Sequence, residues 1–413
     1  MSIRIKVKSL LSTIKKSPSL SIVFLWIRYL RNCFRYAKNS RFNFETSMPY
    51  RQITLEQYRN TFCGYYDISP FNKKDSSLIL VHANNASINY KTDGEKKSDI
   101  FLYNWQENKI IAHVGATRAW NWQQGARAGW YSPSTVIYND FRNGKYCGIL
   151  FDVDQRKSCE LKYPVQSWSD THYAALSYEI LAERRADYGY FCHKRKPSLE
   201  DVNIKVLDFS TESVIYEINW KEALKCLKYS ENPEILRTIH FNHIQFSPDG
   251  SKIAFLVRFD VNRLQHSSLF IADIFSRKVD IPVFDEIISH HIWQSPDEIV
   301  YWGKHKGQEG YFKAILESGT SKIISLTQPD GHPVIISRDE FITDSYPDSR
   351  MRRQLYRGDM QGKFTKLAEY VEQPVLYVEN RCDSHPSLSH DQKWVQIDRM
   401  NKGKRYIMIS GLS

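Results

Sequence analysis

The chain has 413 residues, of which 42% are hydrophobic and 14% aromatic, and its formal net charge at pH 7 is +11. This length allows two average domains or one large closed β-architecture, and the aromatic content favours strands over a helical bundle. The positive charge does not indicate a nucleic-acid-binding domain, because residues 1–44 hold ten basic residues and no acidic one, while the rest of the chain carries 47 basic and 46 acidic residues.

Residues 1–45 are expected to form a basic amphipathic helical arm, followed by a β-domain at residues 46–413. Three arginines share one helical face and three apolar residues share another: Arg28, Arg31 and Arg35 against Ile27, Leu30 and Phe34. The apolar run at 20–27 is too short to span a bilayer, so we expect the arm to lie on an anionic membrane surface. The same pattern also fits a helix that packs on the domain with a solvated basic face.

The cysteines indicate the compartment. The chain has seven, scattered along its length and without a CxxC pair. An odd count without pairing motifs is simplest in a reducing, cytosolic compartment. Together with the basic arm, this predicts a cytoplasmic protein that lies peripherally at the inner face of the membrane.

A turn motif recurs along the chain. The stretch FNHIQFSPDGSKIAFLVRF, residues 241–259, is typical of a strand, a Ser-Pro-Asp-Gly turn and a second strand. Related stretches predict seven units, with these turn serines: Ser69, Ser132, Ser177, Ser247, Ser295, Ser337 and Ser389. Intervals near 40–50 residues are typical of propeller blades, so the sequence predicts an all-β, seven-bladed β-propeller preceded by the helical arm. A pair of β-sandwiches would not explain seven similar turns.

Histidines stand at equivalent positions before four of these turns. His243, His291 and His385 lie four residues before the turn serine, and His332 lies five before it. The first strand of each blade lines the central channel, so we expect these rings to converge on the axis together with His172. Neutral imidazoles at one centre would suit Mn, Fe, Ni or Zn. Alternatively, each histidine bonds the backbone of a neighbouring blade.

The turns HIQFSPDG, HHIWQSPDEIVYW and GHPVIISRDEFITDSYPD resemble those of TolB-type propellers, and more specifically those of the oligogalacturonate lyase family. That resemblance implies a seven-bladed fold and a divalent metal, typically manganese, held by three histidines and a glutamine. The histidines correspond to His243, His291 and His332. The chain departs from the family pattern where the glutamine is expected, because Ile288 stands there; His290 and Gln294 are the candidate replacements.

Candidate substrate-binding residues come from three places. The stretch WNWQQGARAGW, residues 120–130, offers Trp122 for stacking on a sugar ring, with Gln124 and Arg127 for hydroxyl or carboxylate groups. Inter-blade packing is the alternative for this stretch. Arg185 is a candidate anion contact, and His172 and His385 are assigned to the same substrate surface.

These features predict a carbohydrate-active propeller in cell-envelope polysaccharide metabolism. It would bind an acidic oligosaccharide or polysaccharide, with metal-assisted β-elimination as the lyase-like chemistry. The alternatives are a non-catalytic glycan-binding or scaffold propeller, and a glycosyltransferase-associated role in surface polysaccharide biosynthesis. The chain contains no Gly-rich phosphate loop and no GxSxG motif, so no nucleotide cofactor is expected.

Overall fold

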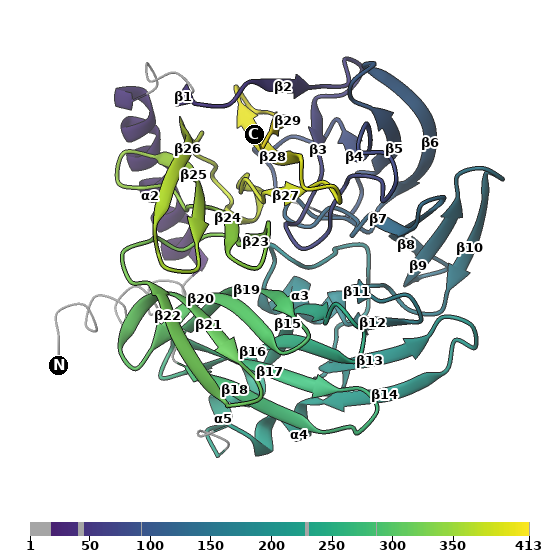
Figure 1. Cartoon of the computed structure of the whole chain (residues 1–413), viewed down its shortest axis with the longest axis vertical. Helices are drawn as coiled ribbons and strands as arrows, with labels where there is room; N and C mark the ends of the chain where they lie inside the picture. Colours follow the sequence, from purple (N-terminus) through teal and green to yellow (C-terminus); the bar gives the residue numbers. More distant parts are fainter. Residues whose placement is uncertain (1–17, 40–44, 92, 228–230, 286, 413) are drawn as a thin grey trace.

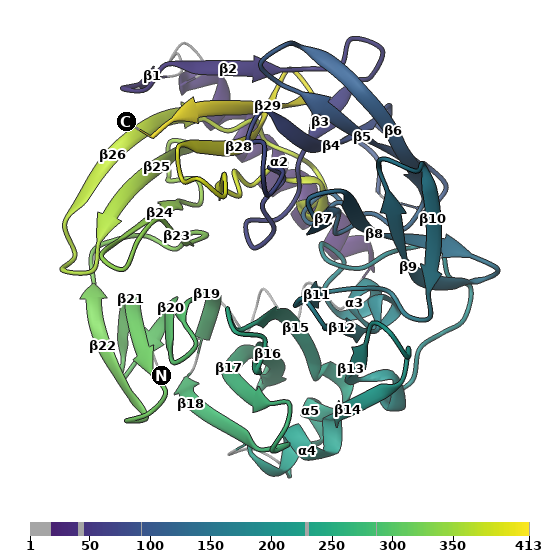
Figure 2. The ribbon, with the colours of Figure 1, turned by 45° about the vertical axis from the view of Figure 1, so that its right-hand side comes forward.

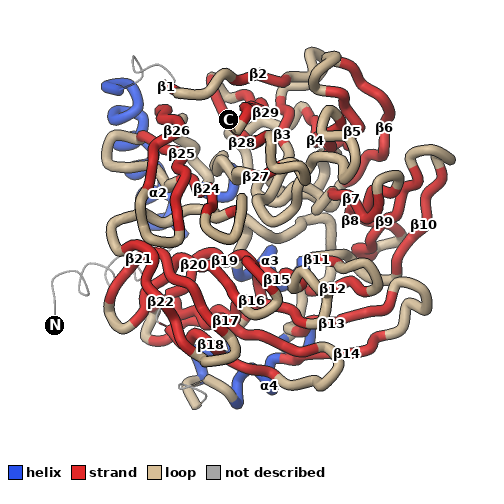
Figure 3. Tube along the Cα trace, in the orientation of Figure 1, coloured by secondary structure: helices blue, strands red, loops and turns tan. Residues whose placement is uncertain are grey.

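A computed structural model describes residues 18–39, 45–91, 93–227, 231–285 and 287–412. The described strands form seven antiparallel sheets, which are arranged radially around a common centre (Figures 1 and 2). The predicted seven-bladed β-propeller is therefore confirmed. Strands dominate and helices are confined to short connections and the N-terminal segment (Figure 3).

The first four blades follow one another in chain order, and each runs from its inner to its outer strand. Blade 1 is β3(Asn60–Phe62), β4(Leu78–Asn84), β5(Ser98–Asn104) and β6(Lys109–Thr117); blade 2 is β7(Gly129–Ser132), β8(Thr135–Arg142), β9(Lys145–Asp152) and β10(Lys157–Leu161); blade 3 is β11(Ser167–Trp168), β12(His172–Leu176), β13(Asn203–Asp208) and β14(Val214–Asn219); blade 4 is β15(His240–Phe246), β16(Lys252–Val261), β17(Leu264–Asp273) and β18(Val279–Asp285).

The last three blades include both ends of the propeller. Blade 5 is β19(Ile287–Ser295), β20(Glu298–His305), β21(Gln308–Ile315) and β22(Thr320–Ser325); blade 6 is β23(Val334–Ile335), β24(Glu340–Asp344), β25(Arg352–Asp359) and β26(Phe364–Val371), with β1(Glu45–Thr46) at its edge; blade 7 is β27(Ser387–Leu388), β28(Trp394–Asn401), β29(Lys404–Gly411) and β2(Tyr50–Ile53). Because β2 pairs with β29, an N-terminal strand completes the C-terminal blade and closes the ring.

Blade 4 shows how the sequence makes these sheets. Its second strand, β16, is buried over most of its length because both of its faces contact other strands, which explains the apolar run KIAFLV. A two-residue turn joins β16 to β17, and Asn262 and Arg263 both have positive φ, 52° and 63°. Such a turn matches the twist of the two strands and fixes their register.

The turn serines mark the blades with one exception. Ser247 lies between β15 and β16, where its hydroxyl accepts from the Lys252 N–H at 2.9 Å. Ser177 was predicted as the equivalent residue of blade 3, but it is the N-cap of helix α3(Tyr178–Arg184) and accepts from the Ile180 N–H. The turn of blade 3 contains Ser169 instead, whose N–H donates to the His172 carbonyl. The helix that follows β12 begins with a capping serine, Ser177, and this serine lies at about the distance along the chain where the turn serine of blade 3 was expected.

The helices lie outside the blades. They are α2(Pro18–Asn39), α3, α4(Trp220–Lys225) and α5(Pro233–Thr238), with 3₁₀ turns at η1(Leu199–Asp201) and η2(Val378–Asn380). Among the described residues, no helix is both long enough and apolar enough to cross a membrane. The chain between β12 and β15 holds α3, α4 and α5.

Helix α2 docks against the connection between blades 6 and 7. The Arg28 guanidinium donates to the Leu376 carbonyl at 3.1 Å, and Arg35 lines a pocket shared with this part of the propeller. Several apolar side chains of the helix are exposed instead, namely Ile22, Val23, Trp26, Ile27, Leu30 and Phe34. The helix therefore packs on the domain, with Arg31 exposed and Arg28 and Arg35 partly buried.

Candidate metal centre

Four histidine rings and one tyrosine ring form a buried cluster near the axis of the propeller. His243 lies in β15, His290 in β19, His332 just before β23 and His385 just before β27. Successive ring centroids are 5.4 Å, 4.1 Å and 4.4 Å apart in that order. Tyr65 completes the circle, at 4.6 Å from the His385 ring and 5.3 Å from the His243 ring. The starts of four inner strands thus bring together residues that lie far apart in sequence.

The backbone is strained at two of these histidines. His243 has φ 53° and His385 has φ 44°, a left-handed conformation that residues with a Cβ rarely adopt. In β15 the pairing with β16 also shifts between Asn242 and Gln245. Such positions cost about 1–3 kcal/mol each and cluster at functional sites. The fold therefore holds these two rings in place at a cost in stability.

Three side chains of this region offer closely spaced ligand atoms. One ligand atom from each of His332, Asp383 and His385 lies within 4.8 Å of the others, and all three residues are buried. The Nε2 atoms of His332 and His385 have no hydrogen-bond partner among the described residues. A buried nitrogen without a partner is costly, so this pair of orphaned atoms points to a ligand. We call these three residues the triad.

Asp344 orients the first triad histidine. The His332 Nδ1–H donates to a carboxylate oxygen of Asp344 at 2.8 Å, and the His332 backbone N–H donates to the same oxygen at 2.8 Å. Because Nδ1 carries the proton, the lone pair of Nε2 is directed away from Asp344 and is available to a ligand. This carboxylate–histidine arrangement is the usual support of a metal-binding imidazole.

Two arginines hold the triad carboxylate. Arg353 donates to one oxygen of Asp383 at 2.8 Å, and Arg381 donates to the other at 2.7 Å. Arg353 also binds Glu372, and Arg381 binds Asp187 at 2.9 Å. Each carboxylate oxygen has a second lone pair, so these bonds leave Asp383 able to contact a cation.

Burial keeps His243, His290 and His385 neutral, and two arginines keep Asp383 charged. Burial lowers the pKa of His290 to about 4, with a further lowering by His332, and burial also holds the pKa values of His243 and His385 well below their usual range. Although burial favours its protonated form, Arg381 and Arg353 hold the pKa of Asp383 well below the usual range. Unprotonated imidazoles and a carboxylate are the forms that bind metals.

This donor set fits a divalent metal. Two imidazole nitrogens and one carboxylate oxygen are ligands that suit Mn, Fe or Zn, and the oriented His332 supplies the expected supporting hydrogen bond. His332, Asp383 and His385 would hold such an ion, with His290 and His243 beside it. This grouping differs from the predicted ligand set of His243, His291 and His332.

His291 is buried but does not join the rings of the cluster. Its neighbour His290 lies against His332 and Tyr66, whereas the His291 ring lies near the backbone of Ala254 in blade 4, and neither of its ring nitrogens has a hydrogen-bond partner among the described residues. The pairing of β19 with β20 shifts between Ile288 and His290, so the simple alternation of sides along the strand fails there. This bulge decides that His290, and not His291, faces the cluster.

His172 lies away from the cluster. It begins β12, the second strand of blade 3, and its ring contacts Phe275 and the Thr171 hydroxyl. The sequence predicts His172 on the axis only if Ser177 is the turn serine of this blade. With Ser169 as the turn serine, His172 follows the turn instead of preceding it.

The WNWQQGARAGW stretch is buried. Trp122 packs in the core of blades 1 and 2, with the Arg405 guanidinium carbon 4.5 Å from its ring centroid. Gln124 is 2% exposed, and both polar atoms of its side chain lack partners among the described residues. Trp122 therefore has the inter-blade packing role that was the alternative for this stretch. The amide of Gln124 has no hydrogen-bond partner among the described residues and so could still bind a ligand.

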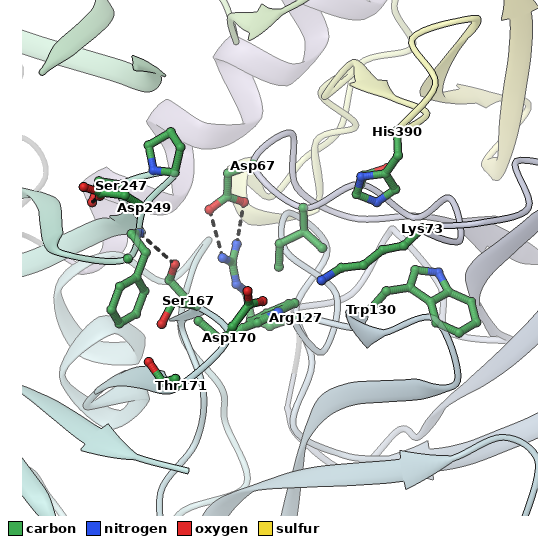
Figure 4. A pocket seen from close by; sticks show the side chains of 17 residues that line it. Asp67, Lys73, Arg127, Trp130, Ser167, Asp170, Thr171, Ser247, Asp249 and His390 are labelled. Carbon is green, nitrogen blue, oxygen red and sulfur yellow. Dashed lines mark hydrogen bonds and ion pairs between the residues drawn. The ribbon is translucent and has the colours of Figure 1, made fainter. Parts of the chain in front are cut away.

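Arg127 lies in a second pocket, where the inner strands end. Its guanidinium binds both carboxylate oxygens of Asp67, at 2.8 Å and 2.9 Å (Figure 4). The pocket has a volume of about 560 Å³ and includes the turn residues Ser69, Ser169 and Ser247. Because Arg127 is 1% exposed and both of its terminal nitrogens donate to Asp67, its main role is to join blades at this end of the propeller.

Arg185 lies beside the cluster through Tyr188, and its role in substrate binding stays a prediction. It pairs with Asp187 at 3.3 Å, and its guanidinium carbon lies 5.3 Å from the centroid of Tyr188. The Tyr188 ring is in turn 5.1 Å from that of His243. Asp187 also binds Arg381, which connects Arg185 to the triad through one carboxylate.

Sequence reasoning missed three residues of this centre. Asp383 stands two residues before His385, and this spacing was the available signal for it. Arg353 and Arg381 lie in a strand and a loop whose sequences show no repeat pattern, so only the folded structure brings them to Asp383.

Comparisons with known proteins agree with this architecture. No protein-family model matches the chain, and no curated protein matches it in sequence. An oligogalacturonate lyase from Vibrio parahaemolyticus is 15% identical, with a TM-score of 0.61 over 90% of this chain and 97% of that one. An oligogalacturonate lyase in complex with manganese is 14% identical, with a TM-score of 0.63 over 90% and 96%. TolB from Acinetobacter baumannii is a more distant match, with a TM-score of 0.39. The chain is therefore similar in fold to oligogalacturonate lyase, as the turn motifs predicted, and shares its propeller architecture.

Proposed function

We propose that the protein binds an acidic oligosaccharide at the triad and cleaves it by metal-assisted β-elimination. The observation that carries this proposal is the pair of orphaned Nε2 atoms on His332 and His385 beside the Asp383 carboxylate. The similarity in fold to an oligogalacturonate lyase in complex with manganese supports the same reading. A uronate is the natural substrate class, because its carboxylate sits next to the carbon that loses a proton.

A bound divalent ion would supply Lewis acidity to the uronate carboxylate and so acidify the C5 proton. His290 is the proposed base, because its ring lies 4.1 Å from that of His332 and is unprotonated at neutral pH. The electrons of the C5–H bond form the C4–C5 double bond while the C4–O bond breaks. The leaving oxygen takes a proton, for which the buried Tyr65 hydroxyl, 2.9 Å from His243 Nδ1, is the proposed donor.

The test is an assay of the purified full-length protein with manganese and oligogalacturonates. Elimination creates a double bond conjugated to the carboxylate, so product formation is followed by ultraviolet absorbance. We expect His290→Ala to lose the product but keep the metal, and His332→Ala to lose both. Turnover that persists in His332→Ala would refute the triad as the reaction centre.

A non-catalytic glycan-binding propeller is the second candidate. Two arginines already donate to the two oxygens of Asp383, which favours this candidate. A carboxylate with these bonds has fewer lone pairs for a metal ion than one that binds the metal alone. Saturable binding of oligogalacturonate without an unsaturated product would support this candidate. A role in the assembly of envelope polysaccharides is compatible with either candidate.

We also propose that the protein works at an anionic membrane surface. The exposed apolar side chains of α2 are large, and Phe34 and Ile27 are 74% and 60% exposed. Residues 1–44 contain ten basic residues and no acid, which complements anionic headgroups. A helix that lies in the interface would place the pocket between α2 and the propeller close to the bilayer, as expected for a peripheral protein at the cytoplasmic face.

A further inference from the structure

A pocket of about 290 Å³ lies between helix α2 and the propeller. From the helix it is lined by Arg28, Arg31 and Arg35, and from the propeller by Arg353 and Arg381, among other residues. Two acidic residues, Asp348 and Glu372, share the lining with these five arginines. The pocket therefore has a surplus of positive charge.

The surplus comes from the helix. On the propeller side, Arg353 pairs with three carboxylates, and Arg381 pairs with Asp187 and Asp383. In the part of the chain that the structure describes, Arg28 is seen bonded to the Leu376 carbonyl and no ion pair is seen for Arg31 or Arg35. Of the two lining acids, Asp348 already accepts from Arg352, and Glu372 pairs with Arg353.

Burial strengthens the need for an anion here. Desolvation lowers the pKa of Arg28, and the neighbouring Arg31 lowers it further while Glu379 acts in the opposite direction. Like charges gathered in a partly desolvated pocket repel one another unless a negative group is present. Guanidinium groups bind carboxylate and phosphate oxygens through paired hydrogen bonds.

The pocket shares its wall with the triad. Arg353 and Arg381 line the pocket and also donate to the two oxygens of Asp383. Tyr346 lines the pocket as well, and its ring is 5.7 Å from that of His332. A ligand in the pocket would therefore be a close neighbour of a group held at the triad.

We propose that Arg28, Arg31 and Arg35 of α2 form an anion subsite that binds a second negative group of the substrate. The group is a carboxylate of the next uronate or a phosphate attached to the glycan, since both present the same oxygen geometry. The helix is thus part of the binding site and selects ligands with two anionic groups. The identity of the glycan rests on the proposed function, whereas the anion subsite does not.

The experiment measures binding to the full-length protein by calorimetry, with pyrophosphate in one arm and trigalacturonate in the other. The test variant is Arg28→Gln/Arg31→Gln/Arg35→Gln, and the matched control is Lys38→Gln, which removes a charge from the same helix outside the pocket. We expect the triple variant to bind at least one probe about tenfold or more weakly, and the control to match the wild type. The single Arg31→Gln variant, at an exposed position, covers the case in which the triple variant loses its fold.

A selective loss of pyrophosphate binding would assign the subsite to phosphate, and a selective loss of trigalacturonate binding would assign it to carboxylate. Equal affinities of the wild type, the arginine variants and the control for both probes would overturn the proposal. Repeating the pyrophosphate titration with His332→Ala separates the anion subsite from the proposed reaction at the triad. If the subsite exists, this variant should bind pyrophosphate as the wild type does, although its triad is disabled.

Discussion

His332 donates its Nδ1–H to Asp344 across 2.8 Å, and neither side chain is exposed to solvent. This pair fixes the imidazole with its Nε2 lone pair directed to the other triad residues. Although burial raises it, His332 and Arg353 together lower the pKa of the Asp344 carboxyl, which keeps it an acceptor. The buried charge of Asp344 is compensated by Arg353, whose guanidinium lies 3.4 Å from its other carboxylate oxygen.

Replacement of this orienting group should weaken the metal centre. We expect Asp344→Asn to lower manganese affinity about 10- to 100-fold, because the amide no longer fixes the tautomer of His332. Fluorescence or calorimetric titration with manganese measures the effect. The control is Asp339→Asn in the exposed turn of the same blade, which should bind as the wild type does. Equal affinities of the two variants would contradict the role of Asp344.

Arg353 is expected to be the most important single cation for stability. Its side chain is fully buried and it pairs with Asp344, Glu372 and Asp383. Arg353→Met leaves these carboxylates uncompensated, so the free energy of unfolding should fall by about 3–5 kcal/mol. Urea denaturation at pH 7 measures this loss.

The matched control lies four residues away in the same strand. Arg357 pairs with Glu340, and both side chains are about one third exposed. Arg357→Met should therefore lower the free energy of unfolding by less than about 1 kcal/mol. If both variants are destabilised equally, burial is not what makes the Arg353 network important.

Stability should fall as the pH is lowered below neutral, and His82 offers a clean test away from the triad. Its Nδ1–H donates to the Cys63 carbonyl at 3.0 Å, and its Nε2 accepts from the Ala126 N–H at 3.0 Å; the second bond needs the neutral ring, because a protonated Nε2 cannot accept. Burial lowers the pKa of His82 to about 4 in the folded protein, against a reference value of 6.5. Between pH 6.5 and 4 the unfolded chain binds the proton and the folded chain does not, so this contribution is present above pH 6.5 and is lost on acidification.

The expected size of this effect is about 1.4 kcal/mol per pH unit within that window. His82→Gln keeps an acceptor for Ala126 but does not titrate, so its free energy of unfolding should depend less steeply on pH between 6.5 and 5.5. His113→Gln is the control, because the His113 side chain is 50% exposed. Identical pH slopes for His82→Gln and the wild type would show that His82 is not held neutral.

Membrane binding should depend on the exposed face of α2. We expect Ile27→Asp/Leu30→Asp to abolish flotation with vesicles that contain anionic lipid, because charged side chains prevent burial of this face in the interface. Arg31→Gln should weaken flotation moderately and make it less sensitive to salt, because a smaller part of the binding is then electrostatic. Flotation of the Ile27→Asp/Leu30→Asp variant at the wild-type level would contradict this location of the helix.

The sequence predicted the architecture well because the propeller repeats itself. Turns such as that at Ser247 recur in each blade, and histidines placed before them, such as His243 and His332, could be assigned to the axis. The prediction failed where the repeat is interrupted. A bulge in β19 brings His290 and not His291 into the cluster, and the insertion after β12 moved the turn of blade 3 away from Ser177.

The rest of the centre has no signal in the repeat. Asp383 and Arg381 lie in the connection between blades 6 and 7, where neither period nor motif constrains the chain. The inward direction of Arg28 and Arg35 was also not predictable, because a basic helical face is equally consistent with solvent, a membrane or a packed partner. These features depend on long-range packing, which a single sequence does not reveal.

The central claim is that the triad holds a divalent metal, and the most direct measurement is the manganese content of the full-length protein after incubation with manganese and removal of the free ion. The account predicts about one equivalent in the wild type and a loss of it in the His332→Ala/His385→Ala variant, while His172→Ala, outside the cluster, keeps the metal. Absence of bound metal from the folded wild-type protein, or equal metal content in all three proteins, would contradict the account.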